Sequence, residues 1–506
     1  MMKPYPACLG LLLALAASAR CQAARISPDE MNRDTRQVFD ASMHWDEQFF
    51  DPAIHLVRRP AGGQHDTLAL RHLVRESSWY ALGLLMRDAP GDRQRASGIL
   101  DAVLQQQFRT RGVRWYGTFR RSPEEPDPTA KTEMWRGYDP NWREFIGTTF
   151  ALILREYPER IPPTLAKRLY ASIDLALQGE IDERRLAPGY SNIALMYGFL
   201  WDFAAQHDQN AVWQKQSAGW VESVYRLFKQ HESFEEYNSP TYYGVDLYGL
   251  ALWRDLGSSG RMRSLGSEME QTLWRDIADF YQPGLRNIAG PYDRSYGMDM
   301  ESYVSLVGVW MRTALDASIA PLPELNATTD HLADIWLAPH MALLGTRIPP
   351  DALTHMKQFQ GDHLVHKQIT DQRVATAWVG HDVLLGGEST SLTKDSGTTT
   401  QFHPATVQWR TPTGPIGWMR LVQSPPVDAS ADRHGLTIAT KGTIRLRLHA
   451  KGLVAARITA RAWDLPGMRV DVDSDAKGFA LEARDDEVDV IYPAMTRMRL
   501  EVKTAP

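Results

Sequence analysis

The sequence predicts an α+β protein of two domains: an N-terminal α/α toroid, meaning an incomplete barrel of helix pairs, followed by a C-terminal antiparallel β-sandwich. Three observations predict it. Helical periodicity runs from about residue 29 to about residue 345. Within it, four similar segments recur about fifty residues apart, a spacing typical of repeat architectures. From about residue 360 the pattern changes to period-two alternation.

The domain boundaries follow from these patterns and from the N-terminus. Residues 1–23 are predicted to be a signal peptide, 24–350 the toroid and 351–506 the sandwich. Lys3 supplies a positive start, Leu9 to Ala17 form the apolar stretch, and small residues offer cleavage sites after Ala19 or Ala23. That stretch is too short for a stable membrane span. We therefore expect a periplasmic or secreted protein without a membrane association after signal cleavage.

The helical region divides into helices that are apolar all round and helices that are amphipathic. The first kind is expected to form the inner ring and begins near Asn141, Asn192, Thr241 and Met298. The predicted helices are Pro28–Phe50, Asp66–Arg87, Asp92–Gln107, Asn141–Glu156, Pro162–Gln178, Asn192–Gln206, Ala211–Gln230, Thr241–Leu256, Arg261–Tyr281, Met298–Leu315 and Thr329–Leu344.

The C-terminal region shows clear strands. Residues 443–448, 468–473 and 498–502 alternate apolar and polar side chains, and Gly, Asp and Pro punctuate the intervals between them. About 145 residues of this kind fit a single β-sandwich domain.

Composition excludes several classes of function. The net charge of −5 argues against a nucleic-acid binder. The only cysteines are Cys8 and Cys21, so a chain cut after Ala23 has no disulfides or thiol chemistry. No metal or cofactor motif is present, and His363 and His366 would lie on opposite faces of a strand. We predict neither a metal nor a cofactor.

The four recurring segments are the predicted functional site. Each is a turn with polar and aromatic residues before an apolar helical run, and they cover residues 138–142, 188–192, 237–243 and 290–296. A helix repeat whose starts carry Tyr and Asn can gather those side chains at one end of a ring. Such an end, in a chain with 16 Trp and 18 Tyr, is suited to holding a sugar polymer.

The third segment is the densest. Pro240 can set a helix start that Asn238 or Ser239 caps, which places Tyr242 and Tyr243 in the first turn. This arrangement predicts a polar, aromatic site on a rigid helix terminus. The alternative is a capped helix whose tyrosines are simply buried.

The other segments supply the remaining candidates. Arg294 can grip a carboxylate with two hydrogen bonds, or alternatively brace its loop through an Arg–Asp pair. His403 stands just before a strand and can reach the toroid from the sandwich, although a lone His is more often structural. The candidate substrate-binding residues are Asn141, Trp142, Tyr190, Glu236, Tyr292 and Trp79.

Tyr, Asn, His and Arg without an obligatory carboxylate pair fit β-elimination on a uronate. The proton at C5 is acidic only if the adjacent carboxylate is neutralised, which Asn, Arg or protonated His can do by hydrogen bonding. A Tyr can then remove the C5 proton or protonate the leaving O4. As a base it needs nearby positive charge, which Arg294 or His403 could provide.

With these residues the chain resembles the toroid polysaccharide lyases, above all the heparinase II/III-like and alginate-lyase-like group. Glu236, Pro240, Tyr242 and Tyr243 are similar in kind and spacing to the inner-helix segment of that group. The resemblance implies an α/α toroid with a C-terminal β-domain and an acidic polysaccharide substrate. It also implies site roles: Tyr242 or Tyr243 as base or acid, Asn192 or Asn238 as the group that neutralises the substrate carboxylate, and His403 as the imidazole.

Two alternative functions also fit these residues. A glycoside hydrolase on the same scaffold would use a pair of carboxylates among Asp139, Glu144, Asp246, Asp299 and Glu301. A non-catalytic glycan-binding protein would use the aromatic residues alone. For the lyase, we expect Tyr243→Phe to abolish elimination and leave the fold intact; full activity in that variant would move the base to Tyr242 or Tyr296.

Overall fold

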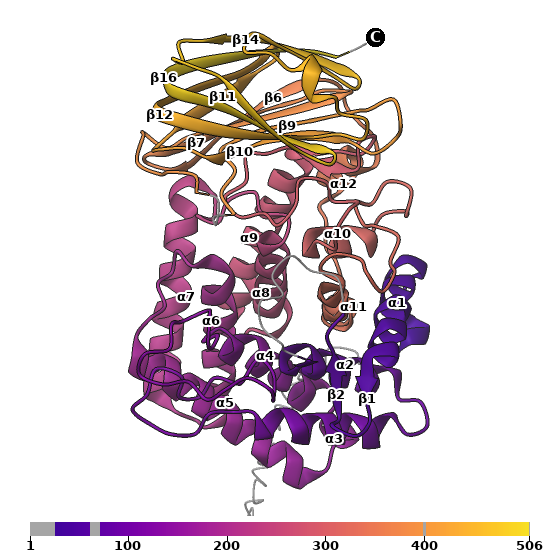
Figure 1. The fold of residues 1–506 in the computed structure, drawn as a ribbon. Coiled ribbons are helices and arrows are strands. Elements are labelled where there is room, and N and C mark those ends of the chain that lie inside the picture. The colour runs from indigo at the N-terminus through magenta and orange to yellow at the C-terminus, as the bar shows by residue number, and fades with distance from the viewer. Residues whose placement is uncertain (1–25, 61–70, 398–400, 505–506) are drawn as a thin grey trace, which may run out of the picture.

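The computed structural model describes residues 26–60, 71–397 and 401–504, and Figure 1 shows a helical region capped by a layered β-domain. The predicted signal peptide, with Cys8, Cys21 and both cleavage sites, lies outside the described residues. The same holds for the first residues of the helix predicted from Asp66. No helix in the described part of the chain is both long and apolar enough to cross a membrane.

The inner helices form a ring. Helices α2, α4, α6 and α8 are successive neighbours, and the short helices α10 and α11 lie between α8 and α2. Their apolar surfaces explain why these helices are the inner ones. All residues of α4 except Arg155 are buried, as expected of a helix surrounded by others. The inner helices are α2 Val74–Arg87, α4 Trp142–Glu156, α6 Ser191–His207, α8 Tyr242–Leu256, α10 Leu306–Arg312 and α11 Ala338–Leu344.

The outer helices are amphipathic and pack against the inner ones. Helix α7 buries only Ser217, Val221, Val224 and Phe228, whose spacing of three or four residues marks one helix face. The outer helices are α1 Arg33–Phe49, α3 Asp92–Gln105, α5 Pro163–Glu183, α7 Ala211–His231 and α9 Gly260–Phe280. Short 3-10 turns lie at Pro28–Glu30, Pro158–Arg160, Leu332–Leu337 (η3) and Ala455–Arg457.

The last part of the toroid differs from the prediction. The helix expected to start at Met298 begins at Leu306, where the Ser305 hydroxyl accepts a hydrogen bond from Gly308 N. The Asn287 side chain holds the preceding segment in a non-helical path, because it donates to Met298 O and accepts from Met300 N. The helix expected at 329–344 is divided into η3 and α11.

Small strands complete the helical region. They are β1 Phe50–Asp51, β2 Leu56–Arg58 and β3 His72–Leu73 in one sheet, and β4 Tyr281–Gln282 and β5 Asn287–Ile288 in another. A further helix, α12 Pro350–Lys357, packs on α9 and β4 after the predicted boundary at residue 350.

The C-terminal domain is one antiparallel sheet of 11 strands that folds into two layers. Its main order is β13-β14-β16-β12-β10-β9-β8-β7-β6, with β11 paired to β12 and β15 to β16. The strands are β6 His363–Thr370, β7 Arg373–Val379, β8 Val383–Ser389, β9 Ala405–Trp409, β10 Gly417–Gln423, β11 Asp428–Asp432, β12 Gly435–His449, β13 Ala462–Leu465, β14 Met468–Ser474, β15 Ala480–Arg484 and β16 Glu487–Thr504.

The long strands β12 and β16 carry the sheet from one layer to the other. Their register shifts at Gly442, between the half of β12 that pairs with β11 and the half that pairs with β10. Strand β11 packs against β8 and β7, and Gly387 of β8 leaves no room for a side chain against Ser430 of β11. The predicted sandwich and the strands at 443–448, 468–473 and 498–502 are therefore present.

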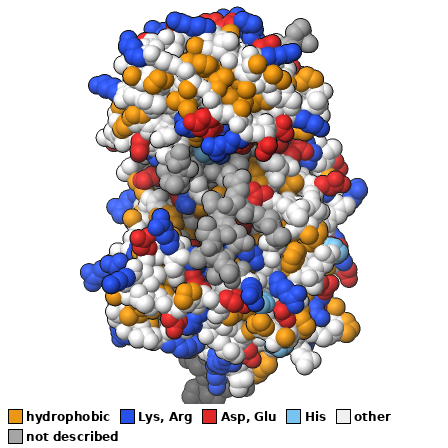
Figure 2. All heavy atoms as spheres, in the orientation of Figure 1, with side chains coloured by type: hydrophobic (Ala, Val, Ile, Leu, Met, Phe, Trp, Pro, Cys, Tyr) orange, Lys and Arg blue, Asp and Glu red, His pale blue; other side chains and the backbone are white. Residues whose placement is uncertain are grey.

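The hydrophobic core of the toroid extends into the adjoining strands of the sheet, while the sandwich has a separate core of its own. Ile369, Ala375, Ala377 and Leu384 of the sheet belong to the same buried cluster as the toroid helices. Hydrogen bonds also join the two domains, among them a β-bridge between Tyr292 of the toroid and His403 of the sandwich. On the described part of the face in Figure 2, Lys and Arg side chains alternate with Asp and Glu.

Candidate active site

The structure brings the four recurring segments together at one end of the inner ring. Asn141 donates a hydrogen bond to the Tyr190 hydroxyl at 2.8 Å, which joins the first segment to the second. The Asn192 amide donates to the Glu236 carboxylate, which joins the second segment to the loop before the third. Arg294 of the fourth segment then bonds to Tyr242 of the third. Two sets of polar contacts, joined by the chain from Tyr190 to Asn192, therefore form a network that lies across the starts of α4, α6 and α8 and the segment before α10.

Arg294 is the centre of this network. Its guanidinium donates to Glu236 Oε1 at 2.5 Å, to Tyr242 Oη at 2.6 Å and to Gln401 Oε1 at 3.2 Å. It also lies over the Tyr242 ring, 3.6 Å from the ring centroid. This guanidinium therefore fixes one carboxylate and one phenol relative to each other.

Two tyrosine hydroxyls meet in the network. Tyr242 Oη and Tyr296 Oη are 2.8 Å apart, and the Tyr296 ring stacks on His331 with ring centroids 4.2 Å apart. Burial raises the pKa of Tyr242 well above its usual value, while the Arg294 charge opposes that rise. Burial likewise raises the pKa of Tyr296. Both tyrosines therefore rest as phenols, and Arg294 is the group that favours the phenolate of Tyr242.

Glu236 is a buried carboxyl group between two donors. It accepts from Asn192 and from Arg294, and the Ser191 hydroxyl lies 3.4 Å from it. Burial raises the pKa of Glu236, and the Arg294 charge opposes that rise. Asn192 and Arg294 together thus form a site that already holds one carboxylate.

The tyrosine expected to act as base, Tyr243, lies elsewhere. Its ring is buried in the hydrophobic core, edge-on to Tyr237, and no described hydrogen bond joins its hydroxyl to Arg294 or Glu236. Consecutive residues of an α-helix point about 100° apart, so Tyr242 and Tyr243 cannot both face the network at the helix end. The structure gives Tyr242 this position.

Two other predicted residues have structural contacts. The Asn238 amide donates to Ala289 O at 2.7 Å and to Pro291 O at 2.9 Å, which clamps two loops together. The Tyr292 hydroxyl accepts from Gln408 Nε2 at 2.6 Å inside the domain contact. Neither side chain reaches the network around Arg294 through a hydrogen bond described by the structure.

His403 is buried at the contact between the domains. Its Nε2 lies 3.3 Å from Arg420 Nη1, and burial together with the Arg420 charge lowers the pKa of His403 to about 3. It is neutral at ordinary pH, so it cannot supply the positive charge that was expected of it. Its main chain forms the bridge with Tyr292 instead.

The neutral state of His403 predicts a pH-dependent stability. Below pH 6.5 the unfolded chain takes up a proton at this imidazole that the folded protein binds only near pH 3. The free energy of unfolding of the wild-type protein should therefore fall, relative to that of His403→Phe, by about 1.4 kcal/mol per pH unit below pH 6.5. Denaturant unfolding across this range measures the difference. Parallel pH profiles for the two proteins would contradict a buried neutral imidazole.

The predicted aromatic residues at the rim are less open than expected. Trp79 and Trp142 are buried, and the Arg75 guanidinium lies 4.7 Å and 5.4 Å from their ring centroids. Tyr190 is partly exposed and contacts Trp135, a tryptophan with 46% exposure. Arg75 and Trp135 are thus additional candidate residues, because they contact the predicted aromatic residues.

Gln401 and Ser191 contact the residues around Arg294 and were not predicted as candidates. Gln401 comes from the sandwich, and its carbonyl accepts from Ser295 N at 3.0 Å while its side chain meets Arg294. The only sequence feature that could have indicated Gln401 as a candidate is its position two residues before His403. Ser191 opens α6 beside Asn192, where a helix-start Ser ordinarily indicates a cap.

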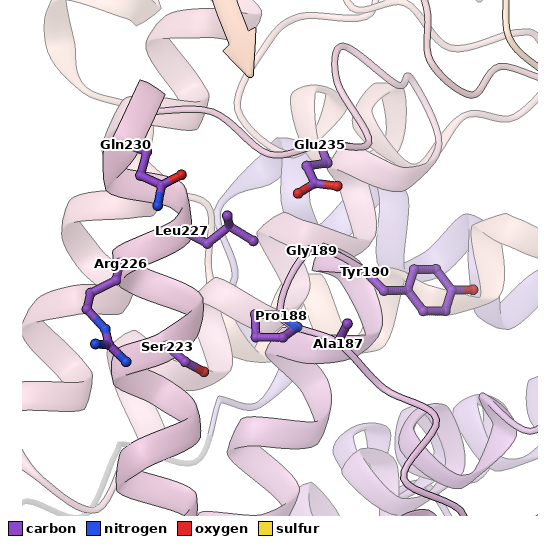
Figure 3. A pocket seen from close by; sticks show the side chains of 9 residues that line it. All are labelled: Ala187, Pro188, Gly189, Tyr190, Ser223, Arg226, Leu227, Gln230 and Glu235. Carbon is purple, nitrogen blue, oxygen red and sulfur yellow. The ribbon is translucent and has the colours of Figure 1, made fainter. Parts of the chain in front are cut away.

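A groove of about 780 Å³ opens beside this network (Figure 3). The loop 187–190 forms one wall, a face of α7 with Ser223, Arg226 and Gln230 forms the other, and Glu235 lies above. Glu235 directly precedes Glu236 in the chain, so the groove and the network are adjacent.

Two known protein families match the sequence. A family described as a domain of unknown function, DUF8769, matches residues 36–346. The chain belongs to the DUF8769 family. A second domain of unknown function, DUF8770, matches residues 359–482 of this DUF8769 protein, within the sandwich. No curated protein matches the sequence.

Solved structures similar to the DUF8769 chain include three of interest. Heparinase III is 8% identical, with a TM-score of 0.43 and coverage of 96% of this chain and 87% of that chain. A chondroitin AC lyase of Streptomyces coelicolor A3 is 10% identical, with a TM-score of 0.39 and coverage of 96% and 80%. The endoglucanase CelQ from Clostridium thermocellum is 8% identical, with a TM-score of 0.28 and coverage of 94% and 93%.

Proposed function

We propose that this protein is an exported polysaccharide lyase that cleaves a uronate-containing glycan by β-elimination, with Tyr242 as base and acid. The observation that carries the proposal is the position of Tyr242, whose hydroxyl accepts from Arg294 and lies beside that of Tyr296. A phenol paired with a fixed cation is suited to proton transfer, because the cation lowers the cost of the phenolate.

The carboxylate of the substrate must be neutralised before C5 can lose its proton. Asn192 and Arg294 are the donors for this purpose, since both already converge on the Glu236 carboxylate. When the substrate carboxylate binds beside Glu236, the two negative charges repel each other. This repulsion raises the pKa of Glu236 further. In our proposal Glu236 is then protonated and shares its proton with the uronate, as a third donor.

The proton transfers balance with one tyrosine. The Tyr242 phenol first loses its proton to solvent, at a cost that the Arg294 charge reduces. The resulting phenolate takes the C5 proton, and the electron pair moves into an enolate-like state held by Asn192 and Arg294. The bond between C4 and O4 then breaks, and the C4=C5 double bond forms. Tyr242, now a phenol, returns the proton to O4 of the leaving chain, so that the enzyme is restored.

A hydrolase is the second candidate, and one observation favours it. Glu236 and Asp139 both contribute to the electrostatic environment of Tyr190, so two carboxyl groups are near the same phenol. A hydrolase needs such a pair on opposite sides of the glycosidic bond. Two other candidates, Glu144 and Asp246, are buried in the interior of the ring.

A panel of polymers separates these functions. The purified protein is incubated with alginate, glucuronan, chondroitin and hyaluronan, and the product is followed by ultraviolet absorbance of the conjugated double bond and by reducing ends. We expect both signals to rise together for at least one polymer. Reducing ends without absorbance would overturn the lyase in favour of the hydrolase, and binding without either signal would overturn both.

Export is part of the proposal and rests on the N-terminal sequence alone. We expect the mature protein to begin after Ala19 or Ala23. N-terminal sequencing of protein from the extracytoplasmic fraction tests this, and a mature chain that keeps Met1 would contradict it.

A further inference from the structure

The groove of Figure 3 contains a cation and a carboxylate that do not pair with each other or with other described residues. Arg226 donates only to the main-chain oxygen of Glu222, at 3.3 Å, among the described contacts. The Glu222 carboxylate accepts from Arg261 at 2.7 Å and 3.0 Å, which lowers the pKa of Glu222, and the nearby Arg226 charge lowers that pKa further without a described ion pair. The side chain of Glu235 makes no described hydrogen bond or ion pair, although its main-chain oxygen accepts from Arg373. Both charged groups are therefore available to a ligand.

The polar side chains of the groove lie on one face of α7. Ser223, Arg226 and Gln230 are spaced by three and four residues, so the helix presents them in one row. Figure 3 shows Gln230 near the end of the helix, with Glu235 across the groove from it. The row offers a guanidinium, an amide and a hydroxyl, which are groups that bind carboxylates and sugar hydroxyls.

The groove is joined to the active site through Tyr190. The loop that contains Tyr190 forms one wall, and its side chain points away from α7 (Figure 3), toward the hydrogen bond with Asn141. Above the two walls, Glu235 faces the groove while the adjacent Glu236 binds Asn192 and Arg294. A polymer that leaves the network past Tyr190 would therefore enter this groove.

We propose that the groove is a distal subsite that binds an acidic sugar of the same polysaccharide, beyond the bond that reacts. Arg226 holds the carboxylate of that sugar, and Gln230 and Glu235 bond to its hydroxyls. The inference rests on the proposed function for the identity of the ligand, and it makes Arg226 a determinant of specificity for long acidic chains.

The test measures affinity against chain length. Calorimetry of the full chain with Tyr242→Phe, which prevents turnover, uses alginate, glucuronan and chondroitin oligosaccharides from disaccharide to decasaccharide. Affinity is expected to rise with length until the oligosaccharide reaches the groove. Adding Arg226→Ala should remove that last increase, about tenfold, because it removes a charged hydrogen bond. Arg226→Lys should keep part of it.

Two controls make the result specific. Lys215→Ala removes an exposed cation of the same helix outside the groove and should leave the length dependence as it is. Decasaccharides whose carboxyl groups have been reduced to alcohols lack the group that Arg226 is proposed to bind. They should therefore bind with equal affinity to Tyr242→Phe and to Tyr242→Phe with Arg226→Ala. An unchanged length dependence in Arg226→Ala, or an equal loss at every length, would overturn the subsite. If the polymer panel shows no double bond but Arg226→Ala still weakens long acidic chains, the subsite stands and the elimination chemistry fails.

Discussion

Replacing Tyr242 with Phe is expected to lower the rate of elimination by about 10²–10⁴-fold, the usual contribution of a positioned acid–base group. The substitution removes only the hydroxyl that bonds to Arg294 and Tyr296 and leaves the ring under the guanidinium. The fold should therefore be unchanged. The measurement is the initial rate of double-bond formation at saturating polymer, together with the thermal midpoint.

The neighbouring residue supplies the matched control. Tyr243→Phe removes a hydroxyl that is buried in the core and makes no described hydrogen bond to Arg294, Glu236 or Tyr296. We now expect this variant to retain activity, in contrast to the expectation from the sequence. Loss of activity in Tyr243→Phe with full activity in Tyr242→Phe would reverse the assignment and return the base to Tyr243.

Replacing Arg294 with Ala is expected to have the second largest effect, a decrease in kcat of about 10²–10³-fold, because a fixed donor to the developing negative charge is lost. The pKa of Tyr242 should also rise, since Arg294 opposes the effect of burial. A base with a higher pKa is less ionised at a given pH, so the residual activity should increase toward alkaline pH. Rates and KM measured across pH test both statements.

Two further variants grade the effect of Arg294. Arg294→Lys keeps the charge but cannot bond to Glu236 and Tyr242 with one planar group, so its rate should be intermediate. Gln401→Ala removes one acceptor at 3.2 Å and should cost less than tenfold. A pH profile for Arg294→Ala that parallels the wild-type profile would show that Arg294 does not act on the ionisation of Tyr242.

The sequence predicted the architecture because its signals are periodic and long. Apolar residues all round mark the inner helices, and α7 shows the spacing of an outer one. The prediction failed at residues 298–305, where the Asn287 side chain binds the main chain of Met298 and Met300. A contact between an amide and a distant main chain leaves no periodic signal.

The site could be predicted only to the level of its segments. Helix starts that carry Tyr and Asn predicted where the site is, but the rotation of α8, which separates Tyr242 from Tyr243, depends on packing against its neighbours. Gln401 was missed for a related reason: it approaches Arg294 from another domain, and sequence separation of more than a hundred residues hides that contact. His403 was expected as a cation, whereas its burial makes it neutral.

The short β-bridge between Tyr292 and His403, extended by the bond from Ser295 N to Gln401 O, has an evolutionary consequence. Arg294 lies between Tyr292 and Ser295 in the chain. Its orientation therefore depends in part on residues 401–403, which the other half of the gene encodes. Recombination that exchanged one half for a foreign one would separate the guanidinium from its support. Selection should therefore keep the two halves together in inheritance, even though each is recognisable as a family of its own.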